Sequence, residues 1–214
     1  STTYVTGKAV EQACEKLKNN LCNLALQTFN CEKEDVEFTS QGVKNLKTNE
    51  LLTLKELALK AMCGNNIETQ VTVTHSSPFS PPPYMVGMVE IELDKETGQV
   101  DILDYVAVVD CGTVINTNLA RVQTEGGLVQ GIGMALYEDV QYTKRGAIPE
   151  NSFMQYKIPT RLDMGKIRVE FESSYESTGP FGAKSIGEIV INTPSPAIAN
   201  AIYRATGKYL KDLP

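Results

Sequence analysis

Apolar residues recur at three- and four-residue spacing over residues 8–29, which predicts a long amphipathic helix near the start of the chain. The stripe consists of Val10, Ala13, Leu17, Leu21 and Leu24. Cys14 lies beside this stripe, so we expect its thiol in the core and not in a reactive position. Residues 1–4, which contain two threonines and a tyrosine, precede the helix and predict a short β-type segment.

Two short segments, residues 36–40 and 43–46, alternate between apolar and polar side chains and therefore predict strands. A second helix is expected to follow them. Thr53 and Glu56 have the spacing of a capping box, and Gly64 is a typical residue to end the helix that this box begins.

The middle of the chain predicts strands on both sides of a proline-rich connection. Residues 68–75 alternate like a strand, whereas residues 77–83 contain four prolines and must be extended. Residues 85–93 and 100–109 alternate again, and the turn between them ends at Gly98. This pattern predicts a β-hairpin.

Residues 116–139 predict an unusual helix. Its apolar stripe includes Leu119 and Val122, yet glycines interrupt it. The glycines are Gly126, Gly127, Gly131 and Gly133. Each of them costs about 1 kcal/mol relative to alanine in a helix interior. We therefore expect close packing of this helix against another backbone or a ligand.

The remaining segments complete an α+β fold with mixed sheets and packed helices. A strand with a turn at residues 144–146, a strand at 167–171 and a final helix that begins near Pro194 are expected. The whole of residues 1–214 is expected to form two subdomains, about 1–75 and 76–214.

Residues 178–188 combine backbone freedom with reactive side chains. Three glycines and a proline predict a loop whose backbone closely approaches a ligand, with Lys184 and Glu188 projecting from it. Apolar neighbours such as Ile186 would bury Glu188 and raise its pKa toward neutrality, which suits a general base. The alternative is that Glu188 caps or solvates the helical turn that follows.

Two familiar motifs fail in this loop. A phosphate-binding P-loop requires glycines where Thr178 and Ala183 stand. A nucleophile elbow centred on Ser185 requires a histidine downstream, and the only histidine of the chain is His75.

Composition narrows the class of protein. The net charge of −6 argues against a nucleic-acid or anionic membrane surface, and no apolar run approaches the length of a membrane helix. Five widely spaced cysteines and one histidine argue against a zinc site or an iron–sulfur cluster held by this chain alone. Buried free thiols in the cytoplasm are expected.

Several segments of the chain resemble one family. They are QTEGGLVQGIGMALYE at 123–138, YKIP at 156–159, GPFGAKSIGE at 179–188 and the hairpin VEIELDKETG at 89–98. Together they resemble the C-terminal part of the molybdopterin-binding region of the xanthine dehydrogenase and aldehyde oxidase family of molybdenum hydroxylases. The resemblance covers nearly the whole chain.

The resemblance implies a molybdenum–pterin cofactor, in a dinucleotide form, to which the protein gives no direct metal ligand. Glu188 would be the base that takes a proton from a metal-bound hydroxo group while that oxygen attacks an electron-poor carbon. Gln123 would touch the phosphate region of the pterin. The remaining cofactor-binding residues would be Lys184, Ser185, Ile186, Gly187, Ser1, Thr2 and Thr3.

The resemblance also implies that the active site is incomplete in this chain. Further cofactor loops belong to an upstream molybdopterin-binding segment, and iron–sulfur clusters and FAD are expected on other domains or subunits of a complex, which can be a dimer. The expected activity is hydroxylation of a purine-like or other N-heterocyclic substrate with oxygen from water, and the chain alone is expected to be inactive. The alternatives are an aldehyde-oxidising enzyme of this family and a non-catalytic assembly module of the same fold.

Overall fold

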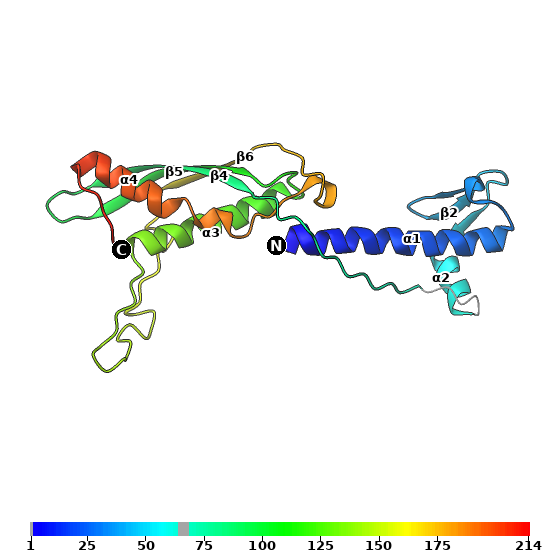
Figure 1. Cartoon of the computed structure of the whole chain (residues 1–214), viewed down its shortest axis with the longest axis horizontal. Coiled ribbons are helices and arrows are strands. Elements are labelled where there is room, and N and C mark those ends of the chain that lie inside the picture. The colour runs from blue at the N-terminus through cyan, green and yellow to red at the C-terminus, as the bar shows by residue number, and fades with distance from the viewer. Residues whose placement is uncertain (1, 64–68) are drawn as a thin grey trace. The chain divides into compact units, whose positions relative to one another are not determined.

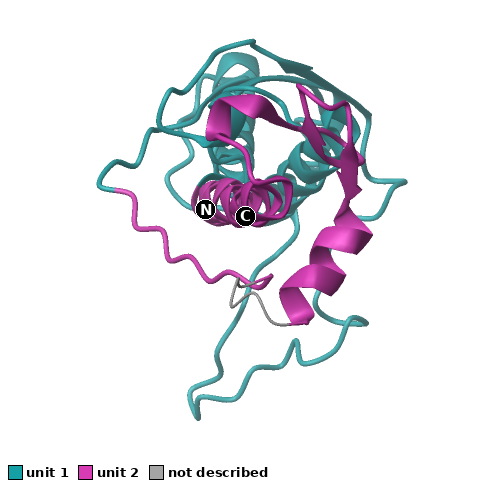
Figure 2. Cartoon of the chain, turned by 90° about the vertical axis from the view of Figure 1, so that its right-hand side faces the viewer, with its two compact units in different colours: residues 1–4, 78–214 teal, residues 5–77 magenta. Residues whose placement is uncertain are grey.

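The structure, a computed structural model, describes residues 2–63 and 69–214. The chain divides into two compact units (Figure 2): Ser1–Tyr4 with Pro78–Pro214 form unit 1, and Val5–Ser77 form unit 2. No helix in the described part of the chain is both long and apolar enough to cross a bilayer.

Unit 1 is built on a three-stranded sheet of order β4-β5-β6. Strands β4 (Tyr84–Leu93) and β5 (Val100–Asp110) form the predicted hairpin, in which Tyr84 pairs with Asp110 and Leu93 with Val100. Strand β6 (Lys166–Phe171) pairs with β5 in parallel. The hairpin and the strand at 167–171 are therefore confirmed.

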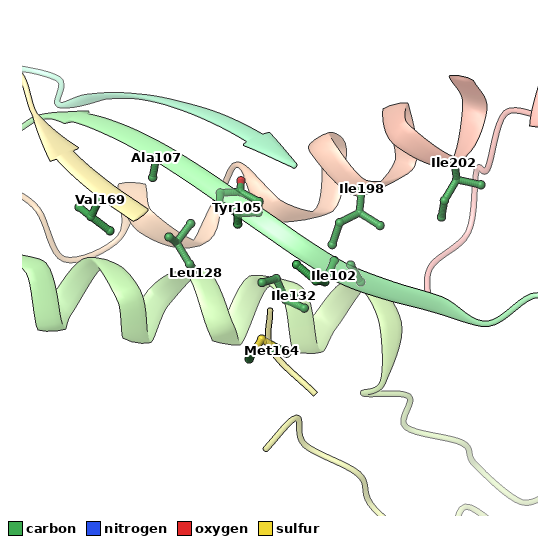
Figure 3. Close-up of a cluster of buried hydrophobic side chains, with 10 residues drawn as sticks. Ile102, Tyr105, Ala107, Leu128, Ile132, Met164, Val169, Ile198 and Ile202 are labelled. Atoms are coloured by element: carbon green, nitrogen blue, oxygen red, sulfur yellow. The ribbon is translucent and has the colours of Figure 1, made fainter. Parts of the chain in front are cut away.

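Two helices cover one face of this sheet (Figure 1): α3 (Thr117–Leu136) and α4 (Pro194–Thr206). Asn116 caps α3 by accepting the Leu119 N–H at 3.0 Å, and α4 begins with a proline that needs no N–H partner. Figure 3 shows the core between the helices and β5. Its members include Ile102, Tyr105, Ala107, Leu128, Ile132, Val169 and Ile198.

The glycines of α3 allow the chain to pass very close to the helix. A Cβ on Gly127 would overlap the Val190 side chain, and one on Gly131 would lie 2.7 Å from Pro194 Cγ and 2.9 Å from the Ile191 carbonyl oxygen. The predicted close packing is confirmed for these two glycines. By contrast, nothing lies within 4 Å of a Cβ added to Gly126.

The predicted stripe of α3 is wrong at its start, because Leu119 is 68% exposed and Val122 67% exposed. The face that packs on the sheet instead contains Leu128, Ile132 and Ala135. The buried Gly127 and Gly131 occupy neighbouring positions of that face, so the pattern of large apolar side chains does not mark it.

Unit 2 contains a long helix, a small sheet and a short helix. Its elements are α1 (Gly7–Phe29), a 3-10 turn η2 (Lys33–Asp35), strands β1 (Val36–Phe38), β2 (Gly42–Asn45) and β3 (Leu51–Thr53), and α2 (Leu54–Met62). The strands pair antiparallel in the order β1-β2-β3. Leu24, Ala25, Val43 and Leu57 form its core.

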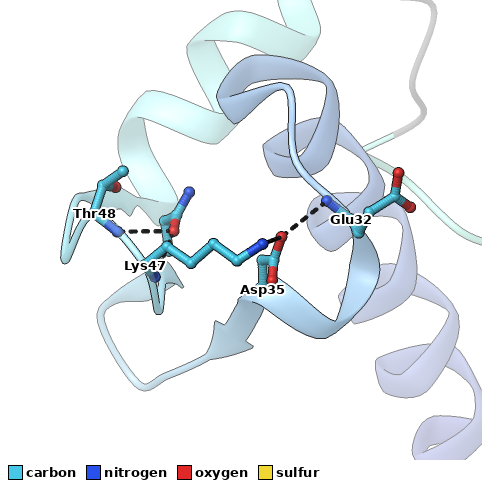
Figure 4. Close-up of polar contacts among 5 residues, drawn as sticks. Glu32, Asp35, Lys47 and Thr48 are labelled. Atoms are coloured by element: carbon cyan, nitrogen blue, oxygen red, sulfur yellow. Dashed lines mark hydrogen bonds and ion pairs between the residues drawn. The ribbon is translucent and has the colours of Figure 1, made fainter.

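Local polar contacts hold the turns of unit 2. Thr53 and Glu56 form the predicted capping box of α2. In the loop between β2 and β3, the Asn45 side chain accepts the backbone N–H groups of Lys47 and Thr48, and the Lys47 ammonium lies 2.7 Å from Asp35 (Figure 4). The helix at 8–29 and the strands at 36–40 and 43–46 are thus confirmed, whereas β3 was not predicted.

Several local predictions are wrong. Residues 2–4 lie in a π-helical turn, η1 (Thr2–Thr6), and not in a β-type segment. Residues 69–75 and the segment around 144–146 are irregular, because no described strand pairs with either, although the turn at Gly146 is present. Gly64 lies outside the described residues. Cys14 is exposed, so its predicted place in the core is also wrong.

The glycines of α3 give a paired test of packing. Gly126→Ala should raise the free energy of unfolding by about 1 kcal/mol, because alanine is the better helix former and the site is open. Gly127→Ala should lower it by about 1–3 kcal/mol, because the buried Val190 cannot move aside easily. Urea denaturation of both variants measures this, and equal effects would contradict the packing described.

Candidate functional site

A pocket of about 650 Å³ lies in unit 1 where three segments meet. They are the beginning of α3, the loop that follows β5, and residues 178–188, called the glycine loop below. It is lined by Thr2, Thr3, Cys111, Thr113, Val114, Ile115, Asn116, Leu119, Ala120, Gln123, Ala183, Lys184, Ser185, Ile186, Gly187 and Glu188. All the predicted site residues except Ser1 line it, and Ser1 lies outside the described residues.

The glycine loop is joined to the loop after β5 by backbone contacts. Ala183 forms an isolated β-bridge with Gly112, the Lys184 N–H donates to the Cys111 carbonyl at 2.7 Å, and the Thr113 N–H donates to the Gly182 carbonyl at 2.8 Å. Gly112 and Gly182 have φ values of 69° and 85°, a region that favours glycine. These glycines allow the turn after β5 and the glycine loop to come together, and residues next to both glycines line the pocket.

The Lys184 side chain turns away from the loop into an ion pair. Its ammonium lies 2.6 Å from the Asp110 carboxylate, 3.5 Å from the Pro82 carbonyl and 5.4 Å from the centre of the Tyr84 ring. The Ser174 hydroxyl also donates to Asp110 at 2.5 Å. Sequence reasoning predicted a projecting lysine but missed Asp110, although Asp110 stands where the strand pattern breaks.

Asp110 is held in its charged form. Partial burial by itself would raise the pKa of Asp110, but hydrogen bonds from Lys184, Ser174 and the Gly112 N–H outweigh burial and lower this pKa below its ordinary value. Next to it, burial and then the Asp110 charge raise the pKa of the Cys111 thiol. Cys111 is therefore a neutral thiol in the wall of the pocket at neutral pH.

Glu188 lies on the open side of the pocket. It precedes the 3-10 turn η4 (Ile189–Ile191) without a side-chain capping bond, so the alternative role as a cap is not observed. The residue is exposed, so the predicted burial against Ile186 and other apolar neighbours is wrong for this chain. The Val190 side chain of η4 turns toward α3 instead, because it packs on Gly127.

Gln123 connects the two walls of the pocket. Its side-chain amide donates to the Gly187 carbonyl at 3.3 Å, one residue before Glu188. A Cβ added to Gly187 would meet nothing within 4 Å, so the backbone is accessible there. No backbone N–H of residues 185–188 donates to a backbone carbonyl within the described part of the chain.

The N-terminal residues approach the same wall. The Tyr4 and Thr178 hydroxyls share a hydrogen bond of 2.7 Å, and Tyr4 is buried. This contact places Thr2 and Thr3 at the pocket although they precede the loop by most of the chain. Sequence reasoning missed the pocket residues Cys111, 113–116, Leu119 and Ala120. The available signal was the end of the alternating strand pattern at residues 110–112.

The profile of a family described as "Molybdopterin cofactor-binding domain" matches residues 1–165. The chain belongs to this family. The resemblance seen in the sequence is therefore confirmed.

Individual relatives extend the match to the glycine loop. The chain is 30% identical over 214 residues to the "Probable hypoxanthine oxidase XdhD" of Escherichia coli strain K12, covering 99% of the chain and 22% of that relative. It is 32% identical over 211 residues to the "6-hydroxypseudooxynicotine dehydrogenase complex subunit gamma" of Paenarthrobacter nicotinovorans, covering 94% of the chain and 26% of that subunit. The chain thus spans about a quarter of the length of these relatives.

A solved structure confirms the fold. The aldehyde oxidoreductase from Desulfovibrio gigas superposes with a TM-score of 0.75 at 26% identity, covering 100% of this chain and 22% of that chain. The predicted α+β fold of the molybdenum hydroxylases is therefore correct.

The residues at the pocket fit a pterin cofactor that carries phosphate. Among the polar groups of the lining residues, the Gln123 amide, the backbone N–H groups of residues 185–188 and the hydroxyls of Thr2, Thr3 and Thr113 can donate hydrogen bonds. The first turn of α3 also faces the pocket, and a helix N-terminus favours an anion. Among the described residues, no group of three or more His, Cys, Asp or Glu side chains could hold a metal ion.

Acid titration tests the Asp110–Lys184 pair. Asp110→Asn should lower the free energy of unfolding by about 1–3 kcal/mol at neutral pH, because it removes a charged hydrogen-bond partner. The folded pKa of Asp110 is depressed. Its carboxylate therefore stabilises fully above the unfolded pKa of about 4, and this contribution is lost as the pH falls through the folded pKa.

The difference between wild type and Asp110→Asn, measured by urea denaturation at several pH values, should shrink below about pH 4. A difference that stayed constant to low pH would contradict the depressed pKa.

Proposed function

We propose that this chain is the C-terminal portion of the molybdenum-binding part of a hydroxylase, in two subdomains and with an incomplete active site. The enzyme oxidises a purine-like or other N-heterocyclic substrate with oxygen derived from water, and Glu188 is its general base. The observation that carries this proposal is the accessible carboxylate of Glu188 in one pocket with Gln123 and the open backbone at Gly187. The hypoxanthine-oxidase relative supports the substrate class.

The pocket residues have two roles: most bind the cofactor, and Glu188 accepts a proton. When bound, the molybdenum–pterin cofactor supplies the oxygen-transfer and redox chemistry. Gln123, residues 185–187 and the threonines at 1–4 bind it through N–H and hydroxyl donors, and the start of α3 favours its phosphate. The Glu188 carboxylate accepts a proton during hydroxylation. This role requires a carboxylate oxygen that is accessible at the pocket surface.

Glu188 is exposed in this chain, which spans about a quarter of the length of its relatives. A general base that acts near neutral pH needs a raised pKa, which burial provides. We propose that the parts of the enzyme beyond this chain cover Glu188, complete the cofactor site and carry iron–sulfur clusters and FAD. The expected dinucleotide form of the cofactor, the dimeric complex and the cytoplasmic location belong to the same proposal.

A change of Glu188 tests the proposed base. In the complete molybdenum enzyme, Glu188→Gln should retain molybdenum and pterin but lower kcat on N-heterocycles at least about 10²-fold, because the amide cannot accept the proton. Glu170→Gln, an exposed carboxylate on β6, is the matched control and should change neither quantity.

Turnover of a panel of heterocycles and aldehydes, with cofactor content assayed on the same samples, decides between the alternatives. Full activity of Glu188→Gln with cofactor bound would overturn the assignment. A preference for aldehydes would instead identify an aldehyde-oxidising enzyme of this family. Absence of cofactor in the complete wild-type protein would favour an assembly module.

A change of Gln123 tests cofactor binding. Gln123→Leu should lower the molybdenum and pterin content of the purified complete enzyme several-fold, because it removes an amide donor worth about 1 kcal/mol or more. Gln130→Leu is two turns further along α3, exposed and away from the pocket, so cofactor content should stay normal. Equal loss in both variants would show a defect of the helix rather than of the site.

A further inference from the structure

We propose that Asp110 is a positioning residue, which holds the loop that carries Glu188 by anchoring the side chain of Lys184. This inference rests on the proposed function, because it explains how the base is placed. It also gives the Lys184 side chain a role different from direct contact with the cofactor.

The anchor lies at a rigid place in the fold. Asp110 is the last residue of β5, the central strand of the sheet, and it pairs with Tyr84 on β4. The Lys184 and Asp110 side chains are only 10% and 20% exposed. An ion pair with so little access to water is screened weakly and has a defined geometry, unlike a surface pair.

The contacts of Lys184 occupy its ammonium on several sides. Besides Asp110, the ammonium has the Pro82 carbonyl and the face of the Tyr84 ring as neighbours. These partners come from β4, from the segment before it and from β5, and none of the three lines the pocket. The ammonium therefore binds the sheet, while the backbone of Lys184 remains in the pocket wall.

The anchor fixes both walls of the pocket at once. On one side, Asp110 accepts the Gly112 N–H at 3.0 Å and so shapes the turn that leads to α3 and Gln123. On the other side, its partner Lys184 stands four residues before Glu188, and the backbone bridge between Ala183 and Gly112 joins the two. Loss of either charge would release the loop and leave the other charge poorly solvated.

A double-mutant cycle in the complete molybdenum enzyme tests this inference. The variants are Asp110→Asn, Lys184→Met and the double change, with Lys184→Arg as a conservative replacement. We expect each single change to lower kcat per bound cofactor about 10- to 10²-fold through misplacement of Glu188, with little change in KM. The double change should cost no more than the worse single change, because the two residues act as one unit. Lys184→Arg should keep most of the rate.

Asp104→Asn is the matched control, since Asp104 is also on β5 and pairs with Arg168 at the exposed side of the sheet. It should leave the rate and the cofactor content unchanged. If Asp110→Asn does not fold, Ser174→Ala removes only one hydrogen bond to Asp110 and should give a smaller loss of the same kind.

Additive effects, or loss of cofactor in Lys184→Met with a normal Asp110→Asn, would overturn the inference and make Lys184 a cofactor contact. Glu188→Gln is measured in the same series. Its full activity would overturn the proposed base, whereas an inactive Glu188→Gln beside a fully active Asp110→Asn would overturn the positioning role alone.

Discussion

The close approach of α3 to residues 190–194 determines where the candidate base lies. Gly127 and Gly131 leave no room for a side chain, so Val190 and Pro194 pack directly on the helix backbone. Because η4 is held there, the chain before it must pass beside Gln123, and Glu188 reaches the pocket. The loss of helix propensity at these glycines is thus offset by contacts that build the site.

One side of the pocket is held by contacts with the sheet, and the other side is exposed to solvent. At the fixed side, Asp110, Lys184 and the bridge between Gly112 and Ala183 join the glycine loop to the sheet. At the open side, Glu188 and the backbone at Gly187 are accessible. Such a division suits a domain that provides part of a cofactor site and receives the rest from other parts of a larger enzyme.

The sequence was sufficient for elements with strong periodicity or clear caps, such as α1, the hairpin of β4 and β5, and the capping box at Thr53. It failed where partners decide the structure. Residues 69–75 alternate like a strand but have no described strand to pair with, and Leu119 belongs to an apolar stripe yet is exposed at the pocket. The Asp110–Lys184 pair joins residues far apart in the chain, and no local pattern indicates such a contact.

The most direct test of the account is the position of molybdenum in crystals of the complete enzyme, located by anomalous scattering at the molybdenum absorption edge. One strong peak is expected beside the Glu188 carboxylate, at the pocket formed by Gln123 and the glycine loop. A fully occupied molybdenum site remote from this pocket would contradict it, because neither the base nor the cofactor-binding residues proposed for this chain could then act.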